Sequence, residues 1–78
     1  MMVRNNEYVV SKVRGAAAER RVSQADLAEV LNLSRMAISR RFTGKSVFAP
    51  EELVAIADHL NVPVATFFGE VASYARAA

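Results

Sequence analysis

Two short helical segments joined by only two or three residues dictate the shape of the middle of this chain. Ser23 and Asp26 stand three residues apart at the start of SQADLAEVL, where each can satisfy a free amide of a first helical turn. We therefore predict a helix over about residues 24–31. Asn32 follows at once, and asparagine is one of the few non-glycine residues that tolerates the left-handed conformation that ends a helix.

A second short helix, RMAISRRFT, is predicted to begin after Ser34 and to stop at Gly44. Two helices so short and so closely linked cannot fold back as an antiparallel hairpin, so they cross steeply and the second stands out from the surface. Ile38 and Phe42 lie one turn apart on it and are expected to face the core. Its opposite side presents Arg35, Met36, Ser39 and Arg40. This is helix-turn-helix geometry, with a second helix small enough to enter a major groove about 12 Å wide.

The flanking segments are predicted to be helical as well. Apolar residues recur at helical spacing over residues 7–21, and Pro50 in a first-turn position marks the start of another helix with an apolar stripe. The stripe consists of Leu53, Ile56, Ala57 and Leu60. After Pro63 we expect a short helical turn that runs through Phe67 or Phe68. The predicted fold is therefore all-α, a compact five-helix domain that takes up residues 1–78.

The composition excludes several classes of function. The chain has no Cys and one His, so it lacks thiol chemistry and the ligands for a metal site. His59 is expected among the core-facing residues of the helix after Pro50, in a structural role. No Gly-rich phosphate loop, paired carboxylate site or nucleophile arrangement occurs, so we expect no enzyme, no cofactor and no small-molecule ligand. The chain also lacks a membrane span and a signal peptide, and we expect it in the cytoplasm.

The charge of the chain is unevenly distributed. Residues 1–45 hold nine Lys and Arg against four acidic residues, a net +5, whereas residues 46–78 have a net charge of −3. Within the first part, residues 34–45 contain four cations and no acid: Arg35, Arg40, Arg41 and Lys45. A charge run is often only a solvated face, but this asymmetry favours an anionic partner on one side of the domain.

The stretch SQADLAEVLNLSRMAISRRFTGKSVFAPEELVAIADHLNVPVATFF resembles the lambda-repressor-like, or Cro-like, helix-turn-helix family of bacterial and phage transcription regulators. The resemblance covers residues 8–68 and depends most on Ser23-Gln24, Leu27-Ala28, Ser34, Ile38-Ser39, Gly44 and the pattern from Leu53 to Val62. In one departure, Asn32 stands where the family usually has Gly. In another, Arg41-Phe42 replaces an aromatic residue followed by Glu, an acid that braces the second helix in many members. How Arg41 is held is therefore open.

The resemblance implies a helix-turn-helix unit at about residues 23–44 whose second helix contacts DNA in the major groove. The candidates for base contact are Arg35, Met36, Ser39 and Arg40. A guanidinium can donate two hydrogen bonds to guanine, and an apolar side chain can touch a thymine methyl. The candidates for phosphate contact are Gln24, Ser34, Arg41, Lys45 and Ser46, and such contacts position a protein without distinguishing sequences. The arginines can instead neutralise phosphates only, and Ser39 can merely face water.

Large apolar residues are frequent near the end of the chain, and residues 63–78 are a candidate dimerisation segment. The candidate dimer interface consists of Val64, Phe68, Val71 and Tyr74. The alternative is that these residues close the core. A homodimer of this fold would place two DNA-contacting helices about one helical turn of DNA apart, roughly 34 Å.

These features together predict a small Cro-like repressor, bacterial or phage in type, that binds double-stranded operator DNA as a homodimer. Because the chain ends soon after the predicted fold, we expect no separate ligand-sensing domain. One alternative is a protein-interaction module of the antitoxin or anti-repressor type that reuses the same fold, and another is architectural DNA binding without sequence preference. The basic cluster of residues 34–45, unmixed with acids, favours DNA over a protein partner.

Overall fold

The two short helices begin at the capping serines that the sequence predicts. In the computed structural model, which describes the backbone of residues 2–68 and the side chains of residues 6–68, α2 (Gln24–Leu31) begins after Ser23 and α3 (Arg35–Phe42) after Ser34. The Ser23 hydroxyl accepts the N–H of Asp26 at 3.1 Å, and the Asp26 carboxylate accepts the N–H of Ser23 at 2.9 Å. The Ser34 hydroxyl accepts the N–H of Ala37 at 3.0 Å. Both predicted caps are confirmed.

Three further elements surround this pair: α1 (Met2–Glu19), α4 (Pro50–Leu60) and the 3-10 helix η1 (Val64–Phe68). The described residues contain no strand, so the predicted all-α class is confirmed. The fifth predicted helix is a 3-10 helix of five residues rather than an α-helix. α1 begins at Met2 rather than at residue 7, since the apolar periodicity that predicts it starts only at Val9.

All four α-helices end in the same way. The residue after each final turn adopts a positive φ, and the N–H of the next residue donates to the carbonyl five positions earlier, at 2.8–2.9 Å. The residues with positive φ are Arg21, Asn32, Gly44 and Asn61. Glycine and asparagine are the usual residues in this motif, whereas an ordinary side chain there costs about 1 kcal/mol. Arg21, with a φ of 59°, is the exception.

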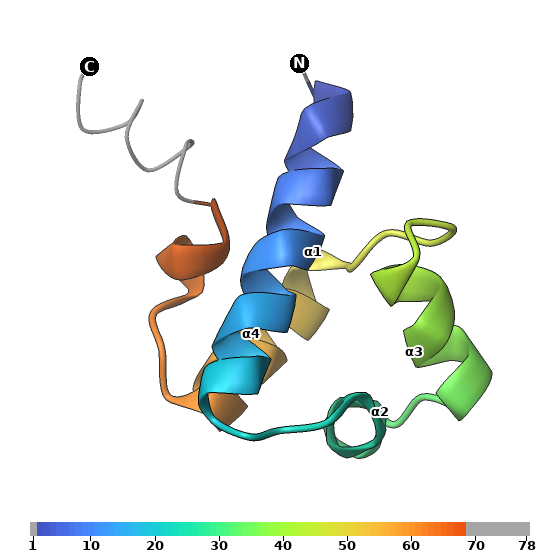
Figure 1. Ribbon diagram of the computed structural model, residues 1–78, viewed down its shortest axis with the longest axis vertical. Helices are drawn as coiled ribbons and strands as arrows, with labels where there is room; N and C mark the ends of the chain where they lie inside the picture. Colours follow the sequence, from blue (N-terminus) through green and yellow to red (C-terminus); the bar gives the residue numbers. More distant parts are fainter. Residues whose placement is uncertain (1, 69–78) are drawn as a thin grey trace.

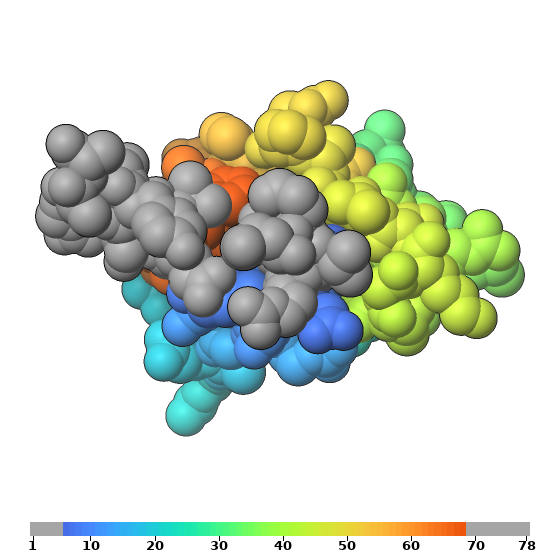
Figure 2. Space-filling view, turned by 90° about the horizontal axis from the view of Figure 1, so that it is seen from above, coloured from blue at the N-terminus to red at the C-terminus, as the bar shows by residue number. Residues whose placement is uncertain are grey.

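The core lies where α1, α4 and η1 meet α2 and the inner side of α3. Six side chains in it are almost completely buried: Val13, Leu27, Ile38, Ile56, Leu60 and Phe67. α1 and α4 occupy the centre, with η1 on one side and α3 standing apart on the other (Figure 1). Seen from above, α3 and the loop after it form the end of the molecule away from η1 (Figure 2).

Two features of the chain bear on the excluded functions. His59 is exposed rather than core-facing, because the stripe from Leu53 to Leu60 occupies the inner side of α4 and His59 lies at its edge. Within residues 2–68, no helix is both long enough and apolar enough to cross a membrane.

Phe67 is the aromatic residue that closes this core, since it has no exposed surface and η1 packs against α1 and α4. We expect Phe67→Ala to lower the free energy of unfolding by about 3–5 kcal/mol, because it leaves a large cavity. Val54→Ala is the control: Val54 is 54% exposed, and its truncation should change that free energy by less than about 0.5 kcal/mol. Urea denaturation followed by circular dichroism measures the free energy of unfolding of both variants. If both lose the same amount, Phe67 does not close the core.

Candidate nucleic-acid interface

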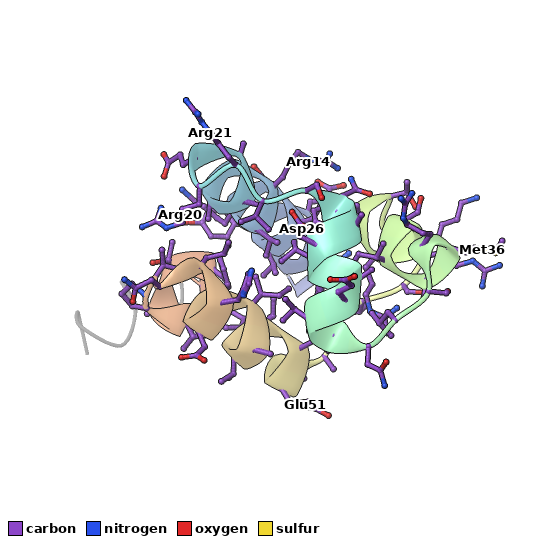
Figure 3. The ribbon with its side chains drawn as sticks, turned by 90° about the horizontal axis from the view of Figure 1, so that it is seen from below. Arg14, Arg20, Arg21, Asp26, Met36 and Glu51 are labelled. Atoms are coloured by element: carbon purple, nitrogen blue, oxygen red, sulfur yellow. The ribbon has the colours of Figure 1, made fainter. Side chains whose placement is uncertain are left out.

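The outer face of α3 carries all four candidates for base contact. Ile38 and Phe42 are 1% and 6% exposed and anchor the inner side of the helix. Arg35, Met36, Ser39 and Arg40 are all exposed on its other side. Met36 is 65% exposed and lies at the outer end of α3 (Figure 3). No ion pair within residues 6–68 involves Arg35 or Arg40. The arrangement is a projecting helix with two exposed guanidinium groups and an apolar side chain beside them.

Four of the five candidates for phosphate contact lie at the starts of α2 and α3 and in the turn after α3. Gln24 is exposed in the first turn of α2, and Ser34 is exposed at the start of α3, where its hydroxyl oxygen caps the helix. Lys45 is exposed and Ser46 half-buried in the turn after α3, and their N–H groups both donate to the Arg40 carbonyl. The positive φ of Gly44, 85°, allows this turn.

Arg41 is the candidate that the structure ties most firmly into the protein. Its Nε donates to Glu52 Oε1 at 2.9 Å and its Nη2 donates to Glu52 Oε2 at 3.1 Å, while Nη1 donates to the Ala37 carbonyl at 3.1 Å. Both side chains are only 18% exposed. This two-pronged pair holds α3 against the start of α4. Two of the five N–H groups of Arg41 are not used in these bonds, but only 18% of the side chain is exposed, so little of it is accessible to a phosphate.

Glu52 has two structural partners. Besides Arg41, its Oε1 accepts the N–H of Ala49 at 3.0 Å, which replaces the missing side-chain cap at the start of α4. Burial raises the pKa of Glu52. The hydrogen bonds from Arg41 and Ala49 and the charge of Arg41 together lower it by more, so the pKa of Glu52 lies below its ordinary value of 4.5. The sequence does not predict this role of Glu52, since nothing in it pairs Glu52 with a residue eleven positions away.

Arg14 of α1 is the second residue that sequence reasoning missed. Its Nη2 donates to the Phe42 carbonyl at 3.1 Å, and its guanidinium lies 5.2 Å from the centroid of the Phe42 ring. The Phe42 ring also meets the ring of Phe48 edge-on at 5.5 Å. The end of α3 is therefore held by α1 as well as by α4. The apolar periodicity of residues 7–21 does not predict this contact, because it joins residues 28 positions apart.

Arg14 also lies between two hollows on the surface. One of about 250 Å³ is shared with Glu7, Thr43 and Gly44, beyond the end of α3. The other, of about 170 Å³, is shared with Gln24 at the start of α2. Arg14 therefore borders both regions that carry candidates for phosphate contact.

The candidate dimer interface is described only in part. Val64 and Phe68 are half-buried and pack against the core, which leaves part of each surface exposed. Val71 and Tyr74 lie outside the described residues.

The chain matches the model of a helix-turn-helix protein family over residues 14–67. That range contains α2, α3, α4 and most of η1. No curated protein and no solved structure matches the chain significantly.

Because Arg41 and Glu52 form an ion pair, we expect the loss of the Glu52 charge alone to destabilise the fold. Glu52→Gln keeps the shape of the side chain but removes its charge, and we expect it to lower the free energy of unfolding by about 1.5–3 kcal/mol. The matched control is Glu51→Gln, since Glu51 is exposed in the same helical turn and its change should cost about 0.5 kcal/mol or less. Equal losses in urea denaturation at pH 7 would show that the ion pair does not stabilise the fold.

The lowered pKa of Glu52 also predicts an acid-dependent stability. A carboxyl whose pKa is lower in the folded than in the unfolded state stabilises the fold above its unfolded pKa, here near 4.5, and this contribution is lost as the pH falls below it. We therefore expect the melting temperature of the wild-type chain to fall more steeply between pH 5 and about pH 3 than that of Glu52→Gln. Asp26, whose pKa is held below 3.8 by the N–H and hydroxyl of Ser23, keeps some acid dependence in the variant. Identical pH profiles would contradict the prediction.

Proposed function

The chain belongs to the lambda-repressor-like, or Cro-like, helix-turn-helix family of DNA-binding regulators, and from this premise we propose that it is a sequence-specific repressor of transcription. It binds double-stranded operator DNA with α3 in the major groove and represses by blocking access of the polymerase. The observation that carries the proposal is the exposed outer face of α3, with Arg35 and Arg40 on either side of Met36 and Ser39. Such a regulator acts in the cytoplasm of a bacterial cell, whether it is encoded by the host or by a phage.

Base contacts are assigned to the outer face of α3. Arg35 and Arg40 each carry the planar donor pair that fits guanine O6 and N7, and the exposed thioether of Met36 suits a thymine methyl. Ser39, between them, can bond to a base edge. These residue types fit a half-site that contains guanine and thymine.

Phosphate contacts are assigned to residues at either end of α2 and α3. Gln24 and Ser34 lie at helix starts, where the positive end of the helix dipole favours an anion, and Lys45 and Ser46 follow α3. Arg41 is paired with Glu52 and only 18% exposed, so the exposed Lys45 is the cation best placed for the backbone after α3.

We also propose that the repressor is a homodimer. The support is the partly exposed apolar surface of Val64 and Phe68, which continues in sequence toward Val71 and Tyr74. Two copies related by a two-fold axis place the α3 helices about one turn of DNA apart, so the operator is a two-fold symmetric sequence.

Selection of bound sequences from random duplex DNA at about 150 mM salt tests the function, because this salt concentration weakens purely electrostatic binding. We expect a two-fold symmetric motif with half-sites about 34 Å apart. A single unsymmetric half-site would keep the DNA-binding function and overturn the dimer. Absence of any enriched motif would overturn sequence-specific repression and favour a protein partner or architectural binding.

Substitution of Arg35 tests the assignment of base contacts. We expect Arg35→Ala to weaken binding to the selected motif by about 1–3 kcal/mol and to leave binding to a scrambled duplex nearly unchanged. The control is Lys12→Ala, which removes one positive charge from α1, where Lys12 stands over the ring of Tyr8. Competition titrations measure both affinities. If Arg35→Ala weakens binding to both duplexes equally, Arg35 contacts phosphate and not a base.

A further inference from the structure

Arg21 ends α1 in a backbone conformation that is unusual for its residue type. Of the four residues with positive φ that end the α-helices, two are asparagines, one is a glycine and one is Arg21. The Arg21 φ of 59° strains its backbone in a way that glycine would avoid. Its side chain is exposed and makes no ion pair within residues 6–68. Strained residues of this kind cluster at functional sites.

Arg21 lies close to the part of the molecule assigned to the DNA backbone. It precedes Gln24, in the first turn of α2, by three residues, and the N–H groups of that first turn are the positive end of the helix dipole. Arg14 borders the hollow that Gln24 also lines. Figure 3 shows Arg14 and Arg21 on the same edge of the molecule in that view; Arg14 lies within α1 and Arg21 just after its end.

Arg14 and Arg21 give this edge two positive charges; among the described residues, the hollow that Arg14 shares with Gln24 is lined by no acid, and Glu7 lines only the other hollow beside Arg14. Arg14 uses one N–H of Nη2 for the Phe42 carbonyl, which leaves other donors of its exposed guanidinium for a ligand. The neighbouring cation Arg20 differs, since it pairs with Glu19 at 3.6 Å and is therefore not counted in the surface. Asp26, the acid nearest in sequence to the start of α2, is occupied by the N–H of Ser23.

We propose that Arg14 and Arg21 form a second DNA-binding surface, the α1 edge, which binds backbone phosphates beside the base pairs contacted by α3. The inference rests on the proposed function and extends it beyond the helix-turn-helix unit. A guanidinium matches the geometry of a phosphate with two parallel hydrogen bonds, so each arginine can hold one phosphate. The α1 edge increases affinity without adding sequence preference, because phosphates are the same at every base pair.

The variant Arg21→Gly separates this function from folding. Glycine adopts the positive φ freely, so we expect the melting temperature to rise by about 4 °C. Binding should weaken by about fivefold per subunit at 150 mM salt, and the salt slope should fall by about 0.9 for each phosphate that is no longer neutralised. The matched control is Asn61→Gly, which puts glycine at the equivalent position after α4, where φ is 60°, and should leave DNA affinity unchanged.

A second variant tests Arg14. Arg14→Gln removes the positive charge and keeps a polar side chain with N–H donors, and circular dichroism shows whether the fold is intact. We expect both variants to weaken binding equally on the selected motif and on a scrambled duplex of the same length, whereas Arg35→Ala discriminates between the two. If the wild-type chain binds and both variants match its affinity at each salt concentration, the α1 edge is overturned and the proposed function stands. If the wild-type chain binds no duplex, the α1 edge and the proposed function are both overturned.

Discussion

The ion pair between Arg41 and Glu52 is the interaction on which the presentation of α3 depends. α3 has only eight residues, too few for a helix to be stable by itself, and it projects from the domain with one side exposed. Burial of Ile38 and Phe42 attaches its inner side, but two apolar anchors one turn apart leave the helix free to rock about the line that joins them. The pair at 2.9 Å and 3.1 Å adds a fixed point on α4 away from that line.

The same pair explains how the chain tolerates its departure from the family. Many members brace the corresponding helix with Glu at the position of Phe42, and here that position is apolar and buried. Phe42 instead packs edge-on against Phe48 and under the guanidinium of Arg14. The acid that braces α3 comes from Glu52 on another helix, and its partner is Arg41, the residue next to Phe42. In this chain α3 therefore supplies the positive partner, Arg41, and α4 supplies the acid, Glu52.

Local signals in the sequence predicted the elements and failed for contacts between them. The Ser23 and Ser34 caps, the left-handed Asn32 and the start of α4 at Pro50 each depend on neighbours within a few residues, and all four are found. The exposed face of α3 was predicted because Ile38 and Phe42 set its phase. The Arg41–Glu52 and Arg14–Phe42 contacts join residues 11 and 28 positions apart, and they depend on how the helices cross. No pattern of neighbouring residues in the sequence determines that crossing angle.

Arg14 and Arg41 both hold α3, yet they differ in what they can still bind. Arg41 donates from Nε and both Nη atoms to protein acceptors and is 18% exposed, so a phosphate must compete with the full negative charge of Glu52. Arg14 is exposed and donates to a neutral carbonyl, so a phosphate can be added to its remaining donors while the Phe42 contact is kept. An anion bound at Arg14 would therefore leave the end of α3 attached to α1. Phosphate binding at the α1 edge is thus compatible with the positioning of α3, whereas phosphate binding at Arg41 meets the charge of Glu52.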